Sequence, residues 1–348
     1  MRFKLPGCRA FMPSYPWCVT IVAVAWLLII SGAHYGLNQE HDRRSVVKMG
    51  YMPVITNMAA PLLDYASISA ADSPIRFKAM KFASFAEMAE ALRNNGIQAA
   101  FIIAPLSIVL RQQGEDVKVV YIGNRHESTL VVRKELHART LEALVGRTIA
   151  VPMRYSGHNL VLHRLLAEAG LEKKINIVEM NPPDMASALA SGSLDAYFVG
   201  EPFAAQTLRF GSSSLLFYVE DVSPDFICNL LLVRQTFIQK QPQIVRSLVQ
   251  GAVRSGLWAQ HHTVKAAEIA SHFWGQPVEL VEYALNTPKN RIVFDRYIPV
   301  QDELQKMADL MVRFDLLEQA DISGLIDDRF ARAAQTAGIE DLKSIFIK

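Results

Sequence analysis

MAEALRNNGIQAAFIIAP (Met88–Pro105) and MASALASGSLDAYFVGEP (Met185–Pro202) are two copies of one pattern, and this internal repeat is the most informative feature of the sequence. At an offset of 97 residues the Met, Leu, Phe and Pro positions and three Ala positions coincide without a gap. The same offset carries Tyr121 onto Tyr218. The two halves of the chain are therefore expected to hold the same order of elements.

Each copy has the pattern of a helix followed by a buried strand. Ser84 and Glu87 form a capping box at the start of the first helix, whose apolar face recurs at helical spacing through Phe85, Met88, Ala89 and Leu92. The strand after it, Ala99–Ile103, is continuously apolar, as expected when both faces are covered. The second copy predicts a helix over 184–191 and a strand over 196–199.

A strand, a loop and a helix precede each copy. Residues 46–50 lead to a helix near 57–65, and residues 148–151 lead to a helix near 158–169. Alternating strands and helices favour parallel sheets with helices on both faces. Two such units in tandem predict two similar α/β lobes, and a cleft between them is where open α/β sheets bind ligands.

The N-terminus has the pattern of an export signal. An uninterrupted apolar run, Val19–Ile30, follows three basic residues, Arg2, Lys4 and Arg9. A positive start, a short apolar run and a small-residue exit are typical of a secretory signal peptide, here residues 1–33. The run is shorter than the roughly 20 residues of a membrane span. Stretched over 17–36, it leaves an uncleaved anchor as the alternative.

Composition excludes several classes of protein. Hydrophobic residues make up 51% and charged residues 20%, which is near the average of globular domains. The chain has 36 basic and 34 acidic residues, and without the three basic residues of the N-terminus 33 basic residues remain. A nucleic-acid binder would show a basic stripe, and none is visible. Cys228, the one cysteine outside the targeting segment, is expected to be a buried core residue.

Five stretches together resemble a known family. They are SFAEMAEALRNNGIQAAFIIAP (84–105), VKVVYIGNRHESTLVVRKE (117–135), GRTIAVP (146–152), DAYFVGEPFAA (195–205) and LLLVRQTFIQKQPQIVRSLVQGAVRSG (230–256). They are similar to the nitrate/sulfonate/bicarbonate (NitT/TauT-like) family of ABC-transporter substrate-binding proteins, over roughly residues 46–330. The resemblance implies an α/β structure with the type II periplasmic-binding-protein fold.

The resemblance also implies a division of the chain. Lobe one would comprise residues 45–130 plus 230–348, and lobe two residues 131–229. The chain would cross between the lobes near Leu130–Arg133 and Leu230–Arg234. The family binds small oxyanions and organic anions and includes binders of pyrimidine precursors, but this chain lacks a lysine or tryptophan set that marks a nitrate or bicarbonate site.

Candidate ligand contacts lie where strands end and helices begin, because free backbone N–H groups and the helix dipole favour an anion there. In lobe one these are Tyr51, Met52 and Asn57, with Pro105 at the equivalent turn of the repeat; packing is the alternative for Tyr51 and Met52. In lobe two the loop offers a fixed cation, hydroxyls and an amide at a helix start, namely Arg154, Tyr155, Ser156, His158 and Asn159. For Ser156 the alternative is a helix N-cap.

Two further candidates are charged. Glu201 follows the second repeat's strand, and three roles are considered for it. It would bind a ligand ammonium, bind a cation beside an anionic ligand, or only favour its own helix N-terminus. Arg125 follows the strand 117–122 and is either a contact on the hinge side or part of the polar surface. No metal ligand set, cofactor motif or catalytic signature is evident.

These patterns predict an exported, monomeric solute-binding protein that catalyses nothing. It would hold a small anion or zwitterion and deliver it to the permease and ATPase subunits of an ABC importer, in the periplasm or cell envelope. Two alternatives stay open, a membrane-anchored sensor or scaffold using the same clamp, and a pyrimidine-precursor binder or enzyme of the same fold. The export signal counts against the enzymes.

Overall fold

The computed structural model of the protein describes residues 15–38, 44–70 and 73–346. Helix α1 (Tyr15–Asn38) belongs to a unit of its own, and residues 45–348 form a second unit, the body. Within α1, Trp17–Tyr35 is apolar and long enough to cross a membrane. The helix therefore extends beyond the apolar run quoted above, so both the signal peptide and the anchor remain open.

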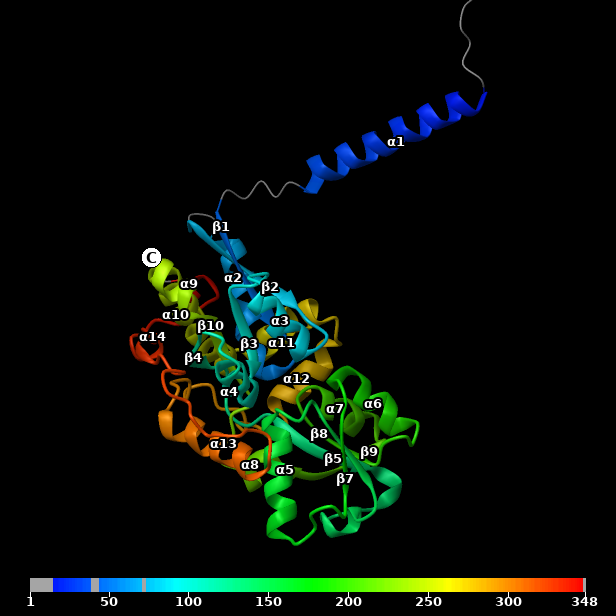
Figure 1. Cartoon of the computed structure of the whole chain (residues 1–348), viewed down its shortest axis with the longest axis vertical. Helices are drawn as coiled ribbons and strands as arrows, with labels where there is room; N and C mark the ends of the chain where they lie inside the picture. The colour runs from blue at the N-terminus through cyan, green and yellow to red at the C-terminus, as the bar shows by residue number, and fades with distance from the viewer. Residues whose placement is uncertain (1–14, 39–43, 71–72, 347–348) are drawn as a thin grey trace, which may run out of the picture. The chain divides into compact units, whose positions relative to one another are not determined.

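The body contains two five-stranded sheets with the same strand order (Figure 1). The first runs β2-β1-β3-β10-β4 and the second β7-β6-β8-β5-β9. The strands of the first are β1 (Ser45–Tyr51), β2 (Ile75–Lys81), β3 (Ala99–Ile103), β4 (Val117–Ile122) and β10 (Asn229–Arg234). Those of the second are β5 (Ser128–Arg133), β6 (Thr148–Val151), β7 (Asn176–Glu179), β8 (Ala196–Gly200) and β9 (Ser213–Tyr218).

Four strands of each sheet run in the same direction, and the strand in fourth place is antiparallel to both of its neighbours. That strand follows the last strand of the other sheet along the chain: β5 follows β4, and β10 follows β9. Leu130–Arg133 and Leu230–Arg234 therefore lie inside sheets, and the chain passes between the sheets a few residues earlier. These two crossing segments, residues 123–127 and 223–228, meet at a backbone bridge between Arg125 and Ile227.

Helices cover the sheets as the repeat predicts. In lobe order they are α2 (Ala59–Ser69), α3 (Phe85–Arg93), α4 (Ala104–Gln112), α5 (Gly157–Glu168), α6 (Pro182–Ala190), α7 (Phe203–Phe210) and α8 (Val219–Val222). The C-terminal part adds α9 (Gln235–Lys240), α10 (Pro242–His261), α11 (Thr263–Trp274), α12 (Val278–Asn286), α13 (Gln301–Arg313) and α14 (Arg329–Arg332). The hydroxyl of Ser84 accepts the Glu87 N–H at 3.2 Å, which confirms the predicted cap of α3.

Three elements differ from the sequence prediction. The helix expected from residue 57 begins as a 3-10 turn, Ile55–Asn57, and continues as α2. Strands β2 and β7 are not evident in the sequence, because both lie at sheet edges and carry mixed polar and apolar residues. An edge strand is covered less completely, so its apolar pattern is weak.

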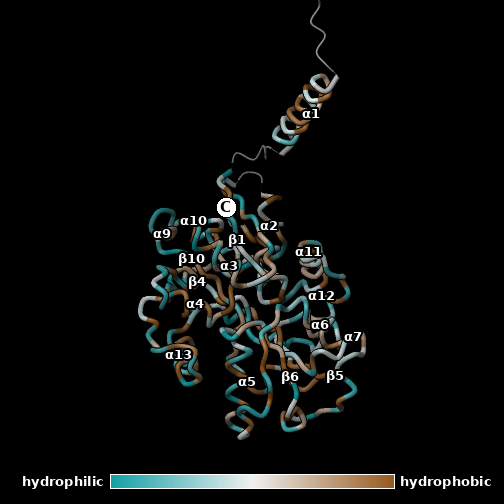
Figure 2. The backbone as a smooth tube through the Cα atoms, turned by 45° about the vertical axis from the view of Figure 1, so that its right-hand side comes forward, coloured by the Kyte–Doolittle hydropathy of each residue, from teal (hydrophilic) through white to brown (hydrophobic). Residues whose placement is uncertain are grey.

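One of the three core clusters of buried side chains in the described residues extends across both sheets. It joins Met52 and Val54 of the first lobe to Tyr197, Phe203 and Ala204 of the second. Figure 2 shows the hydrophobic residues along the strands of the body and along α1. Cys228 is 3% exposed and belongs to the second lobe's own cluster, as expected. The lobes therefore meet in direct apolar contact along a seam.

Candidate functional site

The seam brings together the strand-to-helix turns of both lobes. The backbone N–H of Ile55, in the turn after β1, donates to the carbonyl oxygen of Glu201, in the turn after β8, at 2.8 Å. Met52 and Phe203 lie in the apolar cluster on either side of this bond. The carboxyl ends of the strands thus face each other, as in a two-lobed clamp, and here they touch.

The carboxylate of Glu201 is buried and has several donors. It accepts the Thr129 hydroxyl at 2.8 Å and the Ala205 N–H, in the first turn of α7, at 2.7 Å. Arg291 Nη1 lies 3.7 Å away. Burial raises the pKa of Glu201, and the charge of Arg291 opposes that rise. Glu201 thus stabilises its own helix N-terminus, which is one of its three predicted roles.

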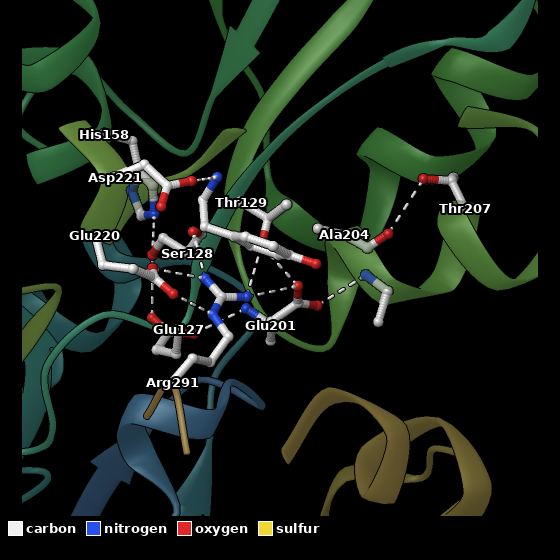
Figure 3. A network of polar contacts seen from close by, with 12 residues as sticks. Glu127, Ser128, Thr129, His158, Glu201, Ala204, Thr207, Glu220, Asp221 and Arg291 are labelled. Atoms are coloured by element: carbon white, nitrogen blue, oxygen red, sulfur yellow. Dashed lines mark hydrogen bonds and ion pairs between the residues drawn. The ribbon is translucent and has the colours of Figure 1, made fainter. Parts of the chain in front are cut away.

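Arg291 is the centre of the polar network in Figure 3. It lies between α12 and α13 and its guanidinium pairs with both oxygens of Glu220, at 2.8 and 3.1 Å. It also donates to the Thr129 hydroxyl at 3.0 Å and the Ser128 carbonyl at 2.8 Å. The guanidinium carbon stands 4.2 Å from the centre of the Tyr218 ring. Arg291 therefore links the C-terminal part of the chain to the second lobe.

Glu127 is a second buried carboxyl group beside Glu201. Its side chain accepts the Glu201 N–H at 2.8 Å and the Ser128 hydroxyl at 3.2 Å. Burial raises the pKa of Glu127 to about 8, while a hydrogen bond from Cys228 opposes the rise and the charge of Glu201 adds to it. His126 and Glu127 have φ of 72° and 65°, in the left-handed region that non-glycine residues seldom adopt. The first crossing segment therefore carries local strain next to an acid that holds its proton.

His158 lies at the edge of this network without a charge of its own. Its Nε2 is 2.9 Å from the Ser128 hydroxyl, and its ring packs edge-on against Phe198 and Phe226. Burial lowers the pKa of His158 to about 3. A neutral, buried imidazole gives an anion no electrostatic attraction, so the structure assigns His158 a packing and hydrogen-bonding role.

Arg125 forms a brace across the two crossing segments and is not free to meet a solute. Its guanidinium pairs with Glu303 of α13 at 2.7 and 3.0 Å and donates to the Asp225 carbonyl at 3.1 Å. The side chain is 2% exposed. Its predicted alternative as polar surface is wrong, because the side chain is buried between α13 and the second crossing segment.

The first-lobe candidates are also engaged within the protein. The Tyr51 hydroxyl donates to the Phe273 carbonyl at 3.2 Å, so its ring packs into the core behind the sheet. Asn57 donates to the Met52 carbonyl at 3.1 Å and accepts from Asn229 at 2.7 Å. Met52 and Pro105 are buried, the latter in the first turn of α4. Packing, the alternative interpretation of Tyr51 and Met52, agrees with this arrangement.

The second-lobe loop lies partly at the surface. Arg154 is 61% exposed and pairs with Glu179 at 2.8 Å. Ser156 caps α5 by accepting the Asn159 N–H at 3.2 Å, which is its alternative role. Arg154 and Asn159 line a groove of about 700 Å³ against the end of α13. Tyr155 packs against the cluster shared by the lobes. Arg154 therefore pairs with Glu179 at this groove. The described partners of the Glu201 carboxylate are different residues, namely Thr129, Ala205 and Arg291.

A larger cleft opens beside the seam and is lined from both lobes. It has a volume of about 870 Å³, and we call it the outer cleft. Its walls are the turns after β1 and β2, the loop between α11 and α12, and helices α6 and α7. Its lining includes the side chains of Lys81, Phe82, Phe203, Arg209, Phe210 and Trp274. None of the eleven candidates from the sequence lines it, because most of its residues lie on helix faces and loops without a motif.

The described residues contain no group of three or more His, Cys, Asp or Glu side chains that could hold a metal ion. Burial also raises the pKa of the Cys228 thiol well above its ordinary value. A thiol in that state is a poor nucleophile. The geometry of the seam is therefore that of a packed junction between lobes.

Comparisons with known proteins agree with this architecture. The chain is 25% identical over 328 residues to a putative aliphatic sulfonates-binding protein of Bacillus subtilis, covering 91% of this chain and 96% of that protein. A ligand-binding component of an ABC-type import system from Staphylococcus aureus, crystallised with zinc bound, superposes with a TM-score of 0.77 at 20% identity, over 84% and 100% of the two chains.

Two further solved structures share the fold. The alkanesulfonate-binding protein of Xanthomonas axonopodis, bound to MOPS, gives a TM-score of 0.70 at 18% identity, over 82% of this chain and 99% of that one. The desulfurization enzyme DSZB gives 0.57 at 14% identity, over 83% and 98%. The model of the NMT1-like family matches residues 40–273, about two thirds of the sequence. With two matching sheets and this match over most of its length, the chain belongs to the NMT1-like family.

Proposed function

We propose that this protein is the extracytoplasmic solute-binding component of an ABC importer and carries a small anionic solute. The observation that carries the proposal is a cleft of about 870 Å³ with walls from both lobes, in a family whose relatives include an aliphatic sulfonates-binding protein and an ABC-type ligand-binding component. Ligand sites of open α/β sheets lie at the carboxyl ends of strands. The turns after β1 and β2 fulfil that condition.

The protein works as a monomeric clamp that binds and releases without chemistry. We place the lobe boundaries at the two crossing segments, 123–127 and 223–228, a few residues before those that the resemblance implies, and the lobes move about these segments. The relatives named above include a sulfonates-binding protein and a ligand-binding component of an import system, which supports binding without catalysis. The permease and ATPase subunits of the importer are its partners.

Helix α1 supports export to the periplasm or cell envelope. Trp17 and Tyr35 stand at the two ends of its apolar stretch, where aromatic residues favour the membrane interfaces. Removal of residues 1–33 releases the body, whereas retention of α1 tethers it. Mass spectrometry of the protein from an exporting bacterial host should find an N-terminus near His34; an intact N-terminus in the membrane fraction would establish the anchored form.

Thermal unfolding with a solute panel tests the function. Nitrate, bicarbonate, taurine, alkanesulfonates, aryl sulfonates and carboxylates are added separately to the purified body. A solute that binds only the folded state stabilises it by about 2.7 kcal/mol at 100 times its Kd. Small-angle X-ray scattering should then show that the binding solute changes the radius of gyration. A panel without any stabilising solute would contradict the proposal.

A further inference from the structure

We propose that the solute is an organic anion with an aromatic or bulky apolar body, and that it binds in the outer cleft. This inference rests on the proposed function and adds the class of ligand and its position. It differs from the expectation that a small anion sits on helix N-termini within the seam.

The helix N-termini at the seam already have acceptors from the chain itself. The first N–H of α4, at Ala104, donates to the Cys228 carbonyl at 2.9 Å. The first turn of α7 is bound by the Glu201 carboxylate, and that of α5 by the Ser156 hydroxyl. The Ile55 N–H is bound by the Glu201 carbonyl. A small anion that bound these four N–H groups would have to displace their acceptors, and at α7 it would lie close to the Glu201 carboxylate.

The outer cleft offers cations that are not paired with acids. Lys81 Nζ contacts the Trp274 carbonyl at 3.3 Å, and the Arg209 guanidinium stands 5.6 Å from the centre of the Tyr283 ring. Neither side chain forms an ion pair with a described residue, and Glu279 is the acid in the lining. Both side chains are exposed, so an acidic group can reach them without a large cost of desolvation.

Much of the rest of the lining is apolar, beside the polar side chains of Gln206 and Gln276. Phe82 comes from the first lobe and Phe210 from α7 of the second, while Trp274 and Phe203, each 3% exposed, lie beneath the surface of the wall. Phe210 is 81% exposed, so a ligand that covers it buries apolar surface already facing water. A volume of about 870 Å³ is typical of sites for ligands of drug size. An anion of a few atoms would fill little of it.

The position of the cleft also suits a clamp. Lys81 and Arg209 belong to opposite lobes, so one ligand that contacts both holds the lobes together. Helix α7 begins directly after Glu201 and Pro202, and the same helix therefore contributes to the cleft and to the polar network of Figure 3. Closure on the ligand and packing of the seam are thus mechanically connected.

The test is titration calorimetry on the body with two probes that share a head group, 2-naphthalenesulfonate and ethanesulfonate. We expect the naphthyl probe to bind at least roughly tenfold more tightly, and Arg209→Ala and Lys81→Ala each to weaken it by roughly tenfold, about 1.4 kcal/mol. Arg154→Ala is the matched control and should leave its affinity unchanged. Unfolding midpoints of all variants verify that they fold.

Four results would overturn the inference. Ethanesulfonate, taurine or nitrate binding more tightly than the naphthyl probe, or loss of binding in Arg154→Ala but not in Arg209→Ala, would leave the clamp in place and move the ligand elsewhere. Absence of binding by every solute of the panel would refute the proposed function as well. Retention of naphthyl binding by the double variant Lys81→Ala/Arg209→Ala would refute the outer cleft alone.

Discussion

The turns after β3 and β8 occupy equivalent places in the two sheets, and their chemistry differs. Strands β3 and β8 are related by the offset of 97 residues and are both third in strand order. After β3, Ala104 begins α4 and offers no charge. After β8, its counterpart Glu201 inserts a carboxylate bound by Thr129, Ala205 and Arg291. One backbone plan thus gives an apolar turn in one lobe and an ionic network in the other.

This difference shows where the second lobe depends on distant residues. The apolar turn has a distant backbone partner, the Cys228 carbonyl, but it needs no distant charge. The ionic turn needs Arg291, which arrives from the loop after α12, and Glu220 from α8. Buried charges are stable only when they are paired and hydrogen-bonded. The ionic network of the second lobe is therefore complete only with Arg291 from the C-terminal part of the chain.

Removal of the Arg291 side chain should lower the free energy of unfolding more than any other change to the two turns. Arg291→Ala leaves the carboxylates of Glu201 and Glu220 without their cation, and breaking a buried pair in this way typically costs about 3–5 kcal/mol of unfolding free energy. Urea unfolding measures the loss. Arg329→Ala, which removes a side chain 63% exposed in its pair with Asp327, is the control and should have little effect. A loss below about 1 kcal/mol for Arg291→Ala would show that the network adds no stability.

Glu201→Ala gives the turn after β8 an alanine, the residue that stands at the equivalent position after β3. We expect a loss of about 1–3 kcal/mol, since donors such as the Thr129 hydroxyl lose a buried acceptor. The loss should be smaller than in Arg291→Ala, because Arg291 keeps its two bonds to Glu220. The same urea experiment compares the two variants. An equal or larger loss in Glu201→Ala would show that Glu201, and not Arg291, contributes most of the stability of the network.

The acid beside the second turn predicts a dependence of stability on pH. The folded pKa of Glu127, about 8, exceeds its ordinary value of 4.5, so between these values the folded state holds a proton that the unfolded state has lost. Stability therefore falls as pH rises across this window, by up to about 1.4 kcal/mol per pH unit. The rise in the pKa of Glu201 acts in the same direction.

His158 acts in the opposite direction at lower pH. Its folded pKa, about 3, is below its ordinary value of 6.5, so its contribution to stability increases up to about pH 6.5. Above that pH the decline due to the carboxyl groups remains alone. Urea unfolding at pH 6.5 and 8.5 should show a fall of unfolding free energy in the natural protein and a smaller fall in Glu127→Gln. An equal fall of unfolding free energy in the two proteins would mean that a group other than Glu127 titrates in this range.

The helix starts of the two copies give the smallest expected difference. Ser84 caps α3 with its hydroxyl, whereas Asn181, the cap residue of α6, makes no side-chain bond to the helix. Ser84→Ala should therefore cost about 1 kcal/mol of unfolding free energy. Asn181→Ala should cost clearly less, and urea unfolding compares them. Equal losses would mean that the caps of the two copies are equivalent.

Much of the architecture could be predicted from the sequence because its signals are local. The helical face of α3, its Ser84 cap and the continuous apolar strands β3 and β8 lie within windows of about ten residues, where periodicity and capping act. The repeat then fixed the order of elements in both lobes. The edge strands β2 and β7 were missed, since partial burial leaves no clear pattern.

The candidate site was predicted less well, for a physical reason. Turns at strand ends identify residues near the seam, and Glu201 and Ser156 do lie at helix starts. Whether such a residue faces a solute or the chain itself depends on which distant groups reach it. Glu201 meets Arg291, 90 residues later in the sequence, and Arg125 meets Glu303. No local pattern encodes these pairs.

From the sequence alone, two α/β lobes with the same order of elements along the chain, an apolar N-terminal segment and a near-neutral body could be inferred. The contacts at the seam, such as that from the Ile55 N–H to the Glu201 carbonyl, and the outer cleft between the turn after β2, helix α7 and the α11–α12 loop depend on tertiary packing. Hydrophobic periodicity specifies elements, whereas the packing of elements far apart in the chain sets which polar groups are buried together and which face a cleft.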